Sequence, residues 1–447
     1  MQVKISNAAI MLLSIGLPVS AASAQDISEE VVELRQMIIE MQSDYEQRIS
    51  ELEARLDKAE RDASGARRKA DDAIELAEET AIEQSSGSSS PNTFNPAVGA
   101  ILSGGYADIG TGWEEIPGFQ PAGEIGTGGS GFSIGEAEIN LKASVDANFF
   151  GNLTFALAEE DGEVEVEFEE AWFQTTAIPN GFTALAGRFF SQAGYLNGFH
   201  FHSDDFVDRP LPYQAFFGGR YAVDGLQARW VAPTPLLVEL GAEVNYGDTF
   251  PTTASDDTSP GAWTLFSNVG GDLGDSHSWK LGVSHIAADA TDRAGGEDDP
   301  ARFTGDSDLT VVDFVWKWAP QGNPTVRNFK VQGEYFTRDE SGTFDGLLYD
   351  GDQTGWYLQG VWQFAQRWRL GLRYDVVDAD NGTSVDGTIL ETPGRESKRS
   401  SLMFDWSPSE FSRLRLQYTN DDVLPESDDQ LYLQYIMSIG AHGAHRF

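Results

Sequence analysis

The sequence predicts an all-β transmembrane antiparallel barrel of about 16 strands, preceded by an N-terminal α-helical coiled coil. The chain contains 11 Trp, 13 Tyr, 27 Phe and 47 Gly, a composition typical of strands with interfacial aromatic side chains and tight turns. It has no Cys, and a closed barrel needs no disulfides because every strand pairs with two others. Beyond the first 24 residues, no stretch approaches the roughly 18 to 20 consecutive apolar residues of a spanning helix.

The two ends of the chain indicate export to the bacterial outer membrane. Lys4 is followed by a short apolar stretch and by the small-x-small sequence Ala22-Ser23-Ala24, so residues 1–24 are predicted to be a signal peptide. At the other end, Phe447 closes an alternating, aromatic-rich strand. A terminal Phe in this position is the signal by which outer membrane barrels are recognised. We therefore expect Phe447 to direct assembly of the barrel.

Residues 25–84 are predicted to form a periplasmic coiled coil. Between 26 and 84 there is no Pro, Phe or Trp, whereas Glu, Arg and Ala are frequent. Apolar residues follow one another at alternating spacings of four and three: Ile27, Val31, Leu34, Ile38, Met41 and Tyr45. A further four-residue step to Ile49 then shifts the phase, as in a stutter. The alternative, a single solvated helix, would leave this stripe with nothing to bury it against.

A polar, flexible linker at 85–93 separates this region from the predicted barrel at 94–447. From Phe94 onward the apolar pattern has a period of two. This pattern predicts sixteen strands, near 97–107, 132–145, 149–159, 165–178, 181–191, 219–231, 235–247, 262–272, 277–288, 307–319, 326–338, 354–365, 367–378, 398–407, 411–421 and 430–447.

The connections between these strands alternate between short and long. Long loops are expected at 108–131, 192–218, 248–261, 289–306, 339–353 and 379–397. Each falls between two short turns, as extracellular loops and periplasmic turns must in an up-and-down barrel. A secreted all-β enzyme would have no reason to keep this order. Because the lumen of sixteen strands is too wide for side chains to fill, we expect a water-filled channel.

Charged residues within the strands share one face and are expected to line the lumen. In 329–338, for example, Lys330, Glu334 and Arg338 alternate with apolar residues. A charge on the lipid face costs about 2 to 4 kcal/mol at the bilayer midplane, so these faces should point inward. The predicted pore-lining residues are Arg188, Lys330, Glu334, Arg338, Arg369, Arg373, Asp375 and Arg415.

The loop at 192–218 is the main candidate for a functional site. We expect it to fold into the lumen and constrict the pore with His200, His202, Asp204, Asp205, Asp208 and Arg209. His200, His202 and Asp204 offer imidazole and carboxylate ligands that suit zinc or another divalent cation. The alternative is that aromatic residues wedge the loop against the wall while the His and Asp residues bond to one another. No cofactor is otherwise expected.

Catalysis is not expected. The chain contains no Gly-x-Ser-x-Gly motif for a nucleophilic serine. The neighbouring carboxylates Glu169 and Glu170 are interpreted as exposed loop or rim charge. His442 and His445 are three residues apart on a strand, so they should lie on opposite faces and are not predicted to share a ligand.

These features resemble those of Gram-negative porins, most nearly the phosphate-selective porin superfamily. The coiled coil is similar to that of trimeric dicarboxylate porins. The motifs at 132–138, 186–190, 204–213 and 440–447 resemble a largely uncharacterised group whose members are labelled porins or zinc-regulated outer membrane receptors. The resemblance implies a homotrimer of channels, although periodicity alone does not distinguish a trimer from a dimer. No run of closely spaced lysines is present, so phosphate selectivity is not implied.

Passive diffusion of small hydrophilic solutes or ions is therefore the predicted function. Residues 85–447 carry 21 Lys and Arg against 53 Asp and Glu, a net formal charge of −32, which favours cations or metal ions. Acidic loops could instead bind divalent cations and lipopolysaccharide, or reflect a saline habitat. Two alternatives remain: a metal or metal-chelate receptor, and a barrel that tethers the envelope to peptidoglycan. The expected partners are outer membrane lipid, lipopolysaccharide and the barrel assembly machinery, without nucleic acid.

Overall fold

A computed structural model describes residues 96–121, 125–135, 137–160, 163–247, 249–252, 261–295 and 299–440 of the chain. The predicted signal peptide, coiled coil, linker and terminal Phe447 lie outside the described residues. None of the helices in the described part is long and apolar enough to cross a membrane.

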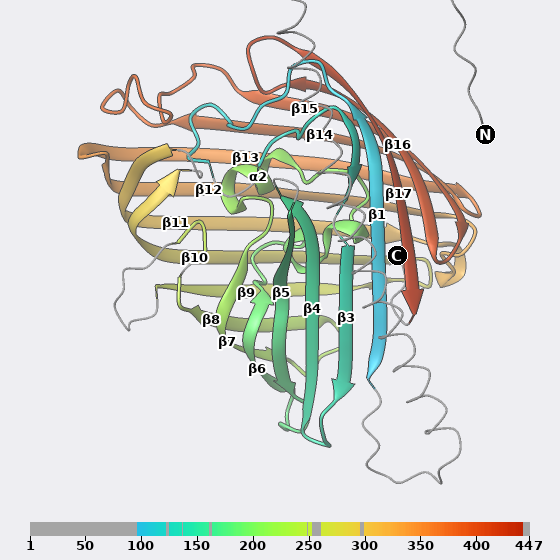
Figure 1. Ribbon diagram of the computed structural model, residues 1–447. Coiled ribbons are helices and arrows are strands. Elements are labelled where there is room, and N and C mark those ends of the chain that lie inside the picture. Colours follow the sequence, from blue (N-terminus) through green and yellow to red (C-terminus); the bar gives the residue numbers. More distant parts are fainter. Residues whose placement is uncertain are drawn as a thin grey trace, which may run out of the picture. The chain divides into compact units, whose positions relative to one another are not determined.

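The strands form one closed antiparallel barrel (Figure 1). They are β1 (Ala97–Asp108), β2 (Gly131–Ile134), β3 (Ala137–Ser144), β4 (Phe149–Glu160), β5 (Glu163–Thr175), β6 (Phe182–Phe190), β7 (Ala222–Val231), β8 (Leu237–Asn245), β9 (Ala262–Leu273), β10 (His277–Gly295), β11 (Asp299–Trp318), β12 (Asn328–Phe344), β13 (Leu347–Ala365), β14 (Trp368–Asp380), β15 (Ser397–Ser409), β16 (Ser412–Asp422) and β17 (Asp428–Gly440). Because β2 and β3 both pair with β1, they are two parts of one strand, and the barrel has sixteen strands. Pairing between β1 and β17 closes the ring.

Each of the sixteen predicted strands overlaps one observed strand, but two predicted loops are in fact hairpins. The loops expected at 289–306 and 339–353 lie largely within strands, since β10 pairs with β11 and β12 with β13 well beyond the predicted ends. Asp345 and Gly346 connect β12 to β13 with positive φ angles of 50° and 78°. A two-residue Asp-Gly turn of this kind matches the twist of paired strands. The polar residues at 339–353, which were expected in a loop, thus belong to a tall hairpin of β12 and β13.

The strands alternate between an apolar outer face and a polar inner face. In β12, Tyr335 points outward and is 46% exposed, whereas its neighbour Glu334 points inward and is 3% exposed. Aromatic rings gather on the outer face near one rim, where Trp368 lies 5.8 Å from Trp406 and 5.3 Å from Phe404. This arrangement is typical of the aromatic girdle of a membrane barrel.

The two rims of the barrel differ. One rim, which we call the turn end, carries the connections near 145–148, 176–181, 232–236, 274–276, 319–327, 366–367 and 410–411. The other, the loop end, carries the long connection between β6 and β7 and the tall hairpins β10–β11 and β12–β13. The predicted order of short and long connections is therefore present, with hairpins in place of two of the loops.

Residues 192–218, which we call the inserted segment, fold into the barrel. The segment contains the 3-10 turns η1 (Leu196–Gly198) and η2 (Phe201–Ser203) and the helix α2 (Leu211–Phe217), which lies within the ring of strands in Figure 1. Every residue of α2 is buried, and the helix contacts β12, β13 and β14. Gly218 ends it in the left-handed conformation, with a φ angle of 62°.

Two segments of the polypeptide fill much of the lumen. Residues 108–121 also turn inward, and Phe119 packs edge-on against Phe216 at 5.5 Å. Together with inward-facing apolar wall residues such as Val311 and Phe336, these two segments form the largest apolar core of the described protein. A ring of sixteen strands is too wide for its wall side chains to fill, which predicted a water-filled interior. Here two loops, rather than wall side chains, fill much of that space.

Candidate functional site

The inserted segment is attached to the wall strands β12–β16 by ion pairs. Asp205 accepts hydrogen bonds from two basic groups of this wall: it pairs with Lys330 on β12 and with Arg369 on β14, the latter at 2.9 Å. Asp205 is 5% exposed, so these charges meet away from bulk water. Asp205, a predicted constriction residue, is therefore in contact with Lys330 and Arg369, two predicted pore-lining residues.

Asp208 makes a second contact with the same wall. Its carboxylate accepts hydrogen bonds from Arg373 at 2.9 Å, from Arg399 at 2.5 Å and from Gln417 at 2.6 Å. These partners lie on β14, β15 and β16, so one carboxylate connects three adjacent strands to the inserted segment. Arg373 also bonds to Asp375 at 3.0 Å. Charge-assisted hydrogen bonds of this type are the strong ones in a low-dielectric interior.

Nearer the turn end of the same wall, three arginines surround Asp405. Arg369, Arg413 and Arg415 all pair with its carboxylate, which is completely buried. Arg413 and Arg415 in addition donate to the backbone carbonyl of Asp204, at 3.1 and 2.8 Å. The wall therefore presents a cationic surface that is complementary to both the carboxylates and a carbonyl of the inserted segment.

Glu334 holds the first turn of the inserted segment. It accepts hydrogen bonds from the backbone N–H groups of Tyr195 and Leu196, both at 3.0 Å. The hydroxyl groups of Tyr213 and Tyr357 donate to the same carboxylate, at 2.9 and 2.6 Å. Glu334 was predicted to line the pore, and it does face the interior. Its carboxylate, however, accepts hydrogen bonds from the inserted segment and from Tyr357 on β13.

Arg209 stabilises the inserted segment internally. Its guanidinium pairs with Asp204 at 2.5 Å and donates to the carbonyl of Leu196 at 2.9 Å. It also lies 4.8 Å from the centre of the Phe201 ring. Asp204 therefore forms an ion pair with Arg209, and this pair stabilises the conformation of the inserted segment.

The electrostatic environment of these loop carboxylates follows from their partners. Burial opposes ionisation of Asp208, but Arg373 and Arg399 outweigh it and hold the pKa of Asp208 well below its usual range. Lys330 and Arg369 do the same for the pKa of Asp205. Burial raises the pKa of Asp204 to about 6, against the opposing charge of Arg209. Asp205 and Asp208 are thus charged at neutral pH.

The other side of the inserted segment contacts β3 and β5 through histidine. Nδ1 of His200 lies 2.9 Å from Glu169 and 3.2 Å from Glu138, and its Nε2 lies 2.9 Å from Glu170. Nδ1 of His202 lies 2.7 Å from the second oxygen of Glu138. We call these five residues the carboxylate–histidine cluster. Burial disfavours the imidazolium, but hydrogen bonds to Glu138 and Glu170 raise the pKa of His200 to about 9.

This cluster differs from the sequence interpretation in two ways. Glu169 and Glu170 were interpreted as exposed rim charge, yet Glu169 is 7% exposed and both carboxylates bind His200. A local bulge between β4 and β5 explains why two consecutive residues face the interior. The structure also brings Glu138 to both imidazoles, whereas Asp204 contacts Arg209. No local sequence signal connects Glu138 with His200, 62 residues away.

The predicted pore-lining residues are otherwise distributed as follows. Lys330, Glu334, Arg369, Arg373, Asp375 and Arg415 face the interior and contact the inserted segment or one another, and Arg338 faces inward beside Gln353. Arg188 is placed differently. It pairs with Asp224 on β7, on the same face as the exposed Leu226 and opposite the core residues Phe189 and Val223. Its side chain is therefore on the outer surface.

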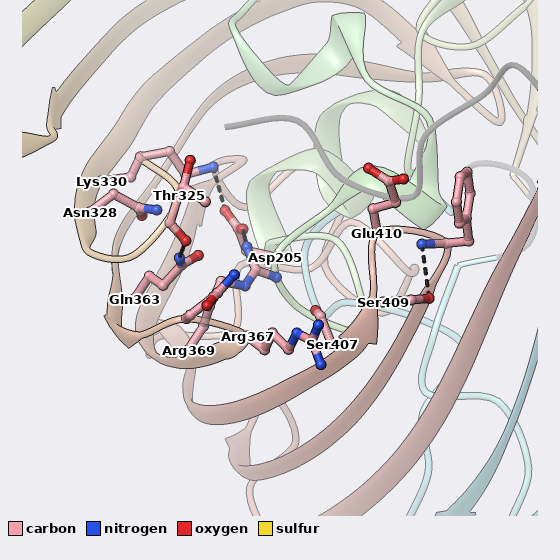
Figure 2. Close-up of a pocket in the computed structure, with 12 residues that line it drawn as sticks. Asp205, Thr325, Asn328, Lys330, Gln363, Arg367, Arg369, Ser407, Ser409 and Glu410 are labelled. Carbon is pink, nitrogen blue, oxygen red and sulfur yellow. Dashed lines mark hydrogen bonds and ion pairs between the residues drawn. The ribbon is translucent and has the colours of Figure 1, made fainter. Parts of the chain in front are cut away.

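A cavity of about 510 Å³ lies at the turn end of the barrel (Figure 2). Asp205 reaches into it from the inserted segment, where Figure 2 shows its ion pair with Lys330. Arg367 and Arg369 line the same cavity, as does Glu410 from the next turn. A smaller cavity of about 210 Å³ shares Asp205 and Lys330 with it. Polar and charged groups thus surround the space beneath the inserted segment.

A closed ring of sixteen antiparallel strands, apolar outside and charged inside, defines the class of protein as a porin-like outer membrane β-barrel. The chain belongs to the same family as an uncharacterized protein of Aquifex aeolicus (strain VF5), with 30% identity over 343 residues that cover 71% of this chain and 70% of the relative. A comparison with models of known families finds no match.

Solved structures share the fold at low sequence identity. The outer membrane channel DcaP of Acinetobacter baumannii aligns with a TM-score of 0.51 and 14% identity, covering 79% of this chain and 99% of DcaP. A loop-deletion mutant of OmpT, an outer membrane protein of Vibrio cholerae, aligns with a TM-score of 0.49 and 12% identity, covering 78% of this chain and all of OmpT. The similarity to DcaP supports the barrel fold.

Proposed function

We propose that this protein is an outer membrane channel for the passive diffusion of small hydrophilic solutes or ions, with the inserted segment as its constriction. The observation that carries the proposal is the attachment of this segment across the lumen, through Asp205 and Asp208, to the cationic wall of β12–β16. A segment held in this way narrows the interior at a fixed depth. Solutes would reach the cavity at the turn end beneath it.

The charges suggest how ions are selected. The net formal charge of −32 on residues 85–447 concentrates cations near the barrel. The cavity at the turn end is lined by Lys330, Arg367 and Arg369, together with the carboxylates of Asp205 and Glu410. We propose that the acidic exterior gives a preference for cations, which the cavity partly offsets. Replacing Arg367 by Gln should then increase the cation preference.

The test is conductance of the purified full chain in a planar bilayer, with the reversal potential measured in a KCl gradient. Discrete channels that close in three steps, with a reversal potential of cation sign, are expected for a trimer. A reversal potential of anion sign would contradict the proposed preference. Absence of conductance from protein that is folded by its heat-dependent electrophoretic mobility would contradict the channel itself.

The two alternatives predict different outcomes. An energy-coupled receptor for a metal or chelate has a plug domain inside a barrel of about 22 strands, whereas this barrel has sixteen. An envelope tether depends on residues 26–84. Deleting 26–84 should therefore leave single-channel conductance intact under the channel proposal, whereas loss of peptidoglycan attachment without any conductance in the full chain would favour the tether.

A further inference from the structure

The carboxylate–histidine cluster joins three separate parts of the barrel. Glu138 comes from β3, Glu169 and Glu170 come from β5, and His200 and His202 come from the inserted segment. The two imidazole rings stack with centres 5.5 Å apart, which places both Nδ1 atoms at the carboxylate of Glu138. Glu138 and His202 are buried, and His200 is nearly so. The barrel therefore gathers nitrogen and oxygen donors at one point.

The spacing of these donors suits a metal ion. Nδ1 of His200 lies 3.2 Å from Glu138, and one ligand atom from each of Glu138, His200 and His202 can be chosen so that all lie within 4.8 Å of one another. Ligands about 2.0 to 2.1 Å from a tetrahedral Zn²⁺ are roughly 3.3 Å apart, so small side-chain rotations would bring the three around one ion. We propose that Glu138, His200 and His202 form a binding site for a divalent metal ion of the Zn²⁺ class.

Glu169 and Glu170 complete this site in different ways. One oxygen of Glu169 pairs with Arg220, while the other lies 2.9 Å from Nδ1 of His200, beside the three ligands. Glu170 lies at Nε2 of His200, the nitrogen that would remain when Nδ1 binds a metal. A carboxylate in that position fixes the orientation of a ligating imidazole and increases its basicity.

The charge of the surroundings also favours a cation. Three carboxylates converge here. Arg220 pairs with Glu169, the charge of Lys142 acts on Glu170, and a bound metal ion would replace the proton that His200 otherwise carries. Two imidazoles and carboxylate oxygens are the ligands of borderline metals such as Zn²⁺, whereas Mg²⁺ and Ca²⁺ prefer oxygen alone. The ion would fix the inserted segment to β3 and β5, on the side away from its ion pairs with β12–β16.

Metal binding to the detergent-solubilised full chain tests the site and does not depend on channel activity. The parent protein should carry His442→Ala and His445→Ala, to remove two imidazoles that could each bind metal, and no histidine tag. After chelator treatment, addition of Zn²⁺ and removal of the unbound ion, we expect one Zn²⁺ per chain by elemental analysis. Co²⁺ added in place of Zn²⁺ should give the intense visible absorption of a four-coordinate ion. Glu138→Gln with His200→Asn and His202→Asn should abolish both signals.

Two further variants make the test specific. His277→Asn with His285→Asn removes two imidazoles on β10, away from the cluster, and should leave binding unchanged. Glu170→Gln should weaken Zn²⁺ affinity by about tenfold to a hundredfold, as expected for a residue that orients a ligand. Equal Zn²⁺ binding by the triple variant and the parent, or less than one Zn²⁺ per parent chain, would overturn the proposal. Heat-dependent electrophoretic mobility confirms that each variant is folded.

Discussion

At the scale of single residues, the carboxylate of Asp208 connects the inserted segment to Arg373, Arg399 and Gln417 on three adjacent wall strands. Its partners Arg373 and Arg399 are each about 1% exposed in their side chains, so water cannot replace the carboxylate if it is lost. Each arginine keeps one other carboxylate, Asp375 for Arg373 and Asp421 for Arg399, so the loss of Asp208 weakens the compensation of two buried charges. Because these ion pairs are buried and shielded from water, they can hold the inserted segment in position although they are polar.

Asp208→Asn should therefore destabilise the folded barrel by about 2 kcal/mol, through the loss of charge-assisted hydrogen bonds, and loosen the inserted segment. We expect a lower midpoint of urea unfolding in detergent, faster proteolysis within 192–218 and noisier or larger single-channel conductance. Glu396→Gln is the matched control, because Glu396 pairs with Lys398 at the exposed loop end and solvent screens that pair. Equal behaviour of the two variants would show that the Asp208 contacts do not hold the segment.

At the scale of elements, the inserted segment combines an apolar helix with charged turns. Helix α2 buries Phe216 and Phe217 against Phe336 on β12, while the residues before it carry the ion pairs. The apolar contacts keep the helix inside the lumen, and the ionic contacts determine its depth. Because attachment depends on ionised carboxylates, the position of the segment should respond to strong acid.

The direction of that response follows from the pKa of Asp208. Its pKa is lower in the folded protein than in a free chain, where an Asp titrates near about 3.9. The stabilisation is therefore complete above about pH 4 and is lost as the pH falls through the lower, folded pKa. The contribution of Asp208 to the protease resistance of 192–218 should stay constant from about pH 8 to pH 5, an interval in which Asp204, with a pKa of about 6, titrates instead. The contribution of Asp208 should change only under strongly acidic conditions.

Asp208→Asn supplies the control for this titration, since it has no carboxylate at that position to protonate. Its inserted segment should be loose at every pH, with a smaller acid-induced change than in the unaltered protein. A large change between pH 8 and pH 5 that is present in the unaltered protein and absent from Asp208→Asn would contradict the assignment, because Asp208 stays ionised throughout that interval.

At the scale of the whole molecule, closure of the ring between β1 and β17 is what removes every strand edge. Sixteen strands then present a continuous apolar surface outside, while the charged residues meet one another inside. Assembly must bring β17 to β1, and Phe447, which follows β17 in the sequence, is predicted to be recognised by the assembly machinery.

Deleting Phe447 should accordingly reduce insertion into the outer membrane severalfold while leaving synthesis unchanged. The measurement is the amount of heat-modifiable protein in outer membrane fractions, compared with total protein by immunoblot. Phe411→Ala, which alters another aromatic residue near the turn end, is the control and should insert normally. Normal insertion without Phe447 would remove its proposed role in assembly.

Some features of this protein are determined by sequence alone. The period-two pattern predicted sixteen strands and most of their inward-facing residues, with Arg188 as an exception, because the alternation of side chains along a strand is a local property. The height of the hairpins could also have been predicted: Asp345-Gly346 is a two-residue turn signal inside a region interpreted as a loop. Loop 192–218 stood out through its density of ligands and charges, and all of its predicted site residues belong to the segment that enters the lumen.

Only the tertiary structure decided which of these residues meet. Glu138 and His202 are 64 positions apart, and Asp208 and Arg399 are 191 apart, so no local pattern relates them. Their contact depends on closure of the ring and on the path of the inserted segment, which bring β3, β5 and β12–β16 to the same interior. Likewise, a bulge in β5 turns Glu169 and Glu170 inward against simple alternation. Sequence determines the faces of the strands, whereas the closed barrel determines the partners.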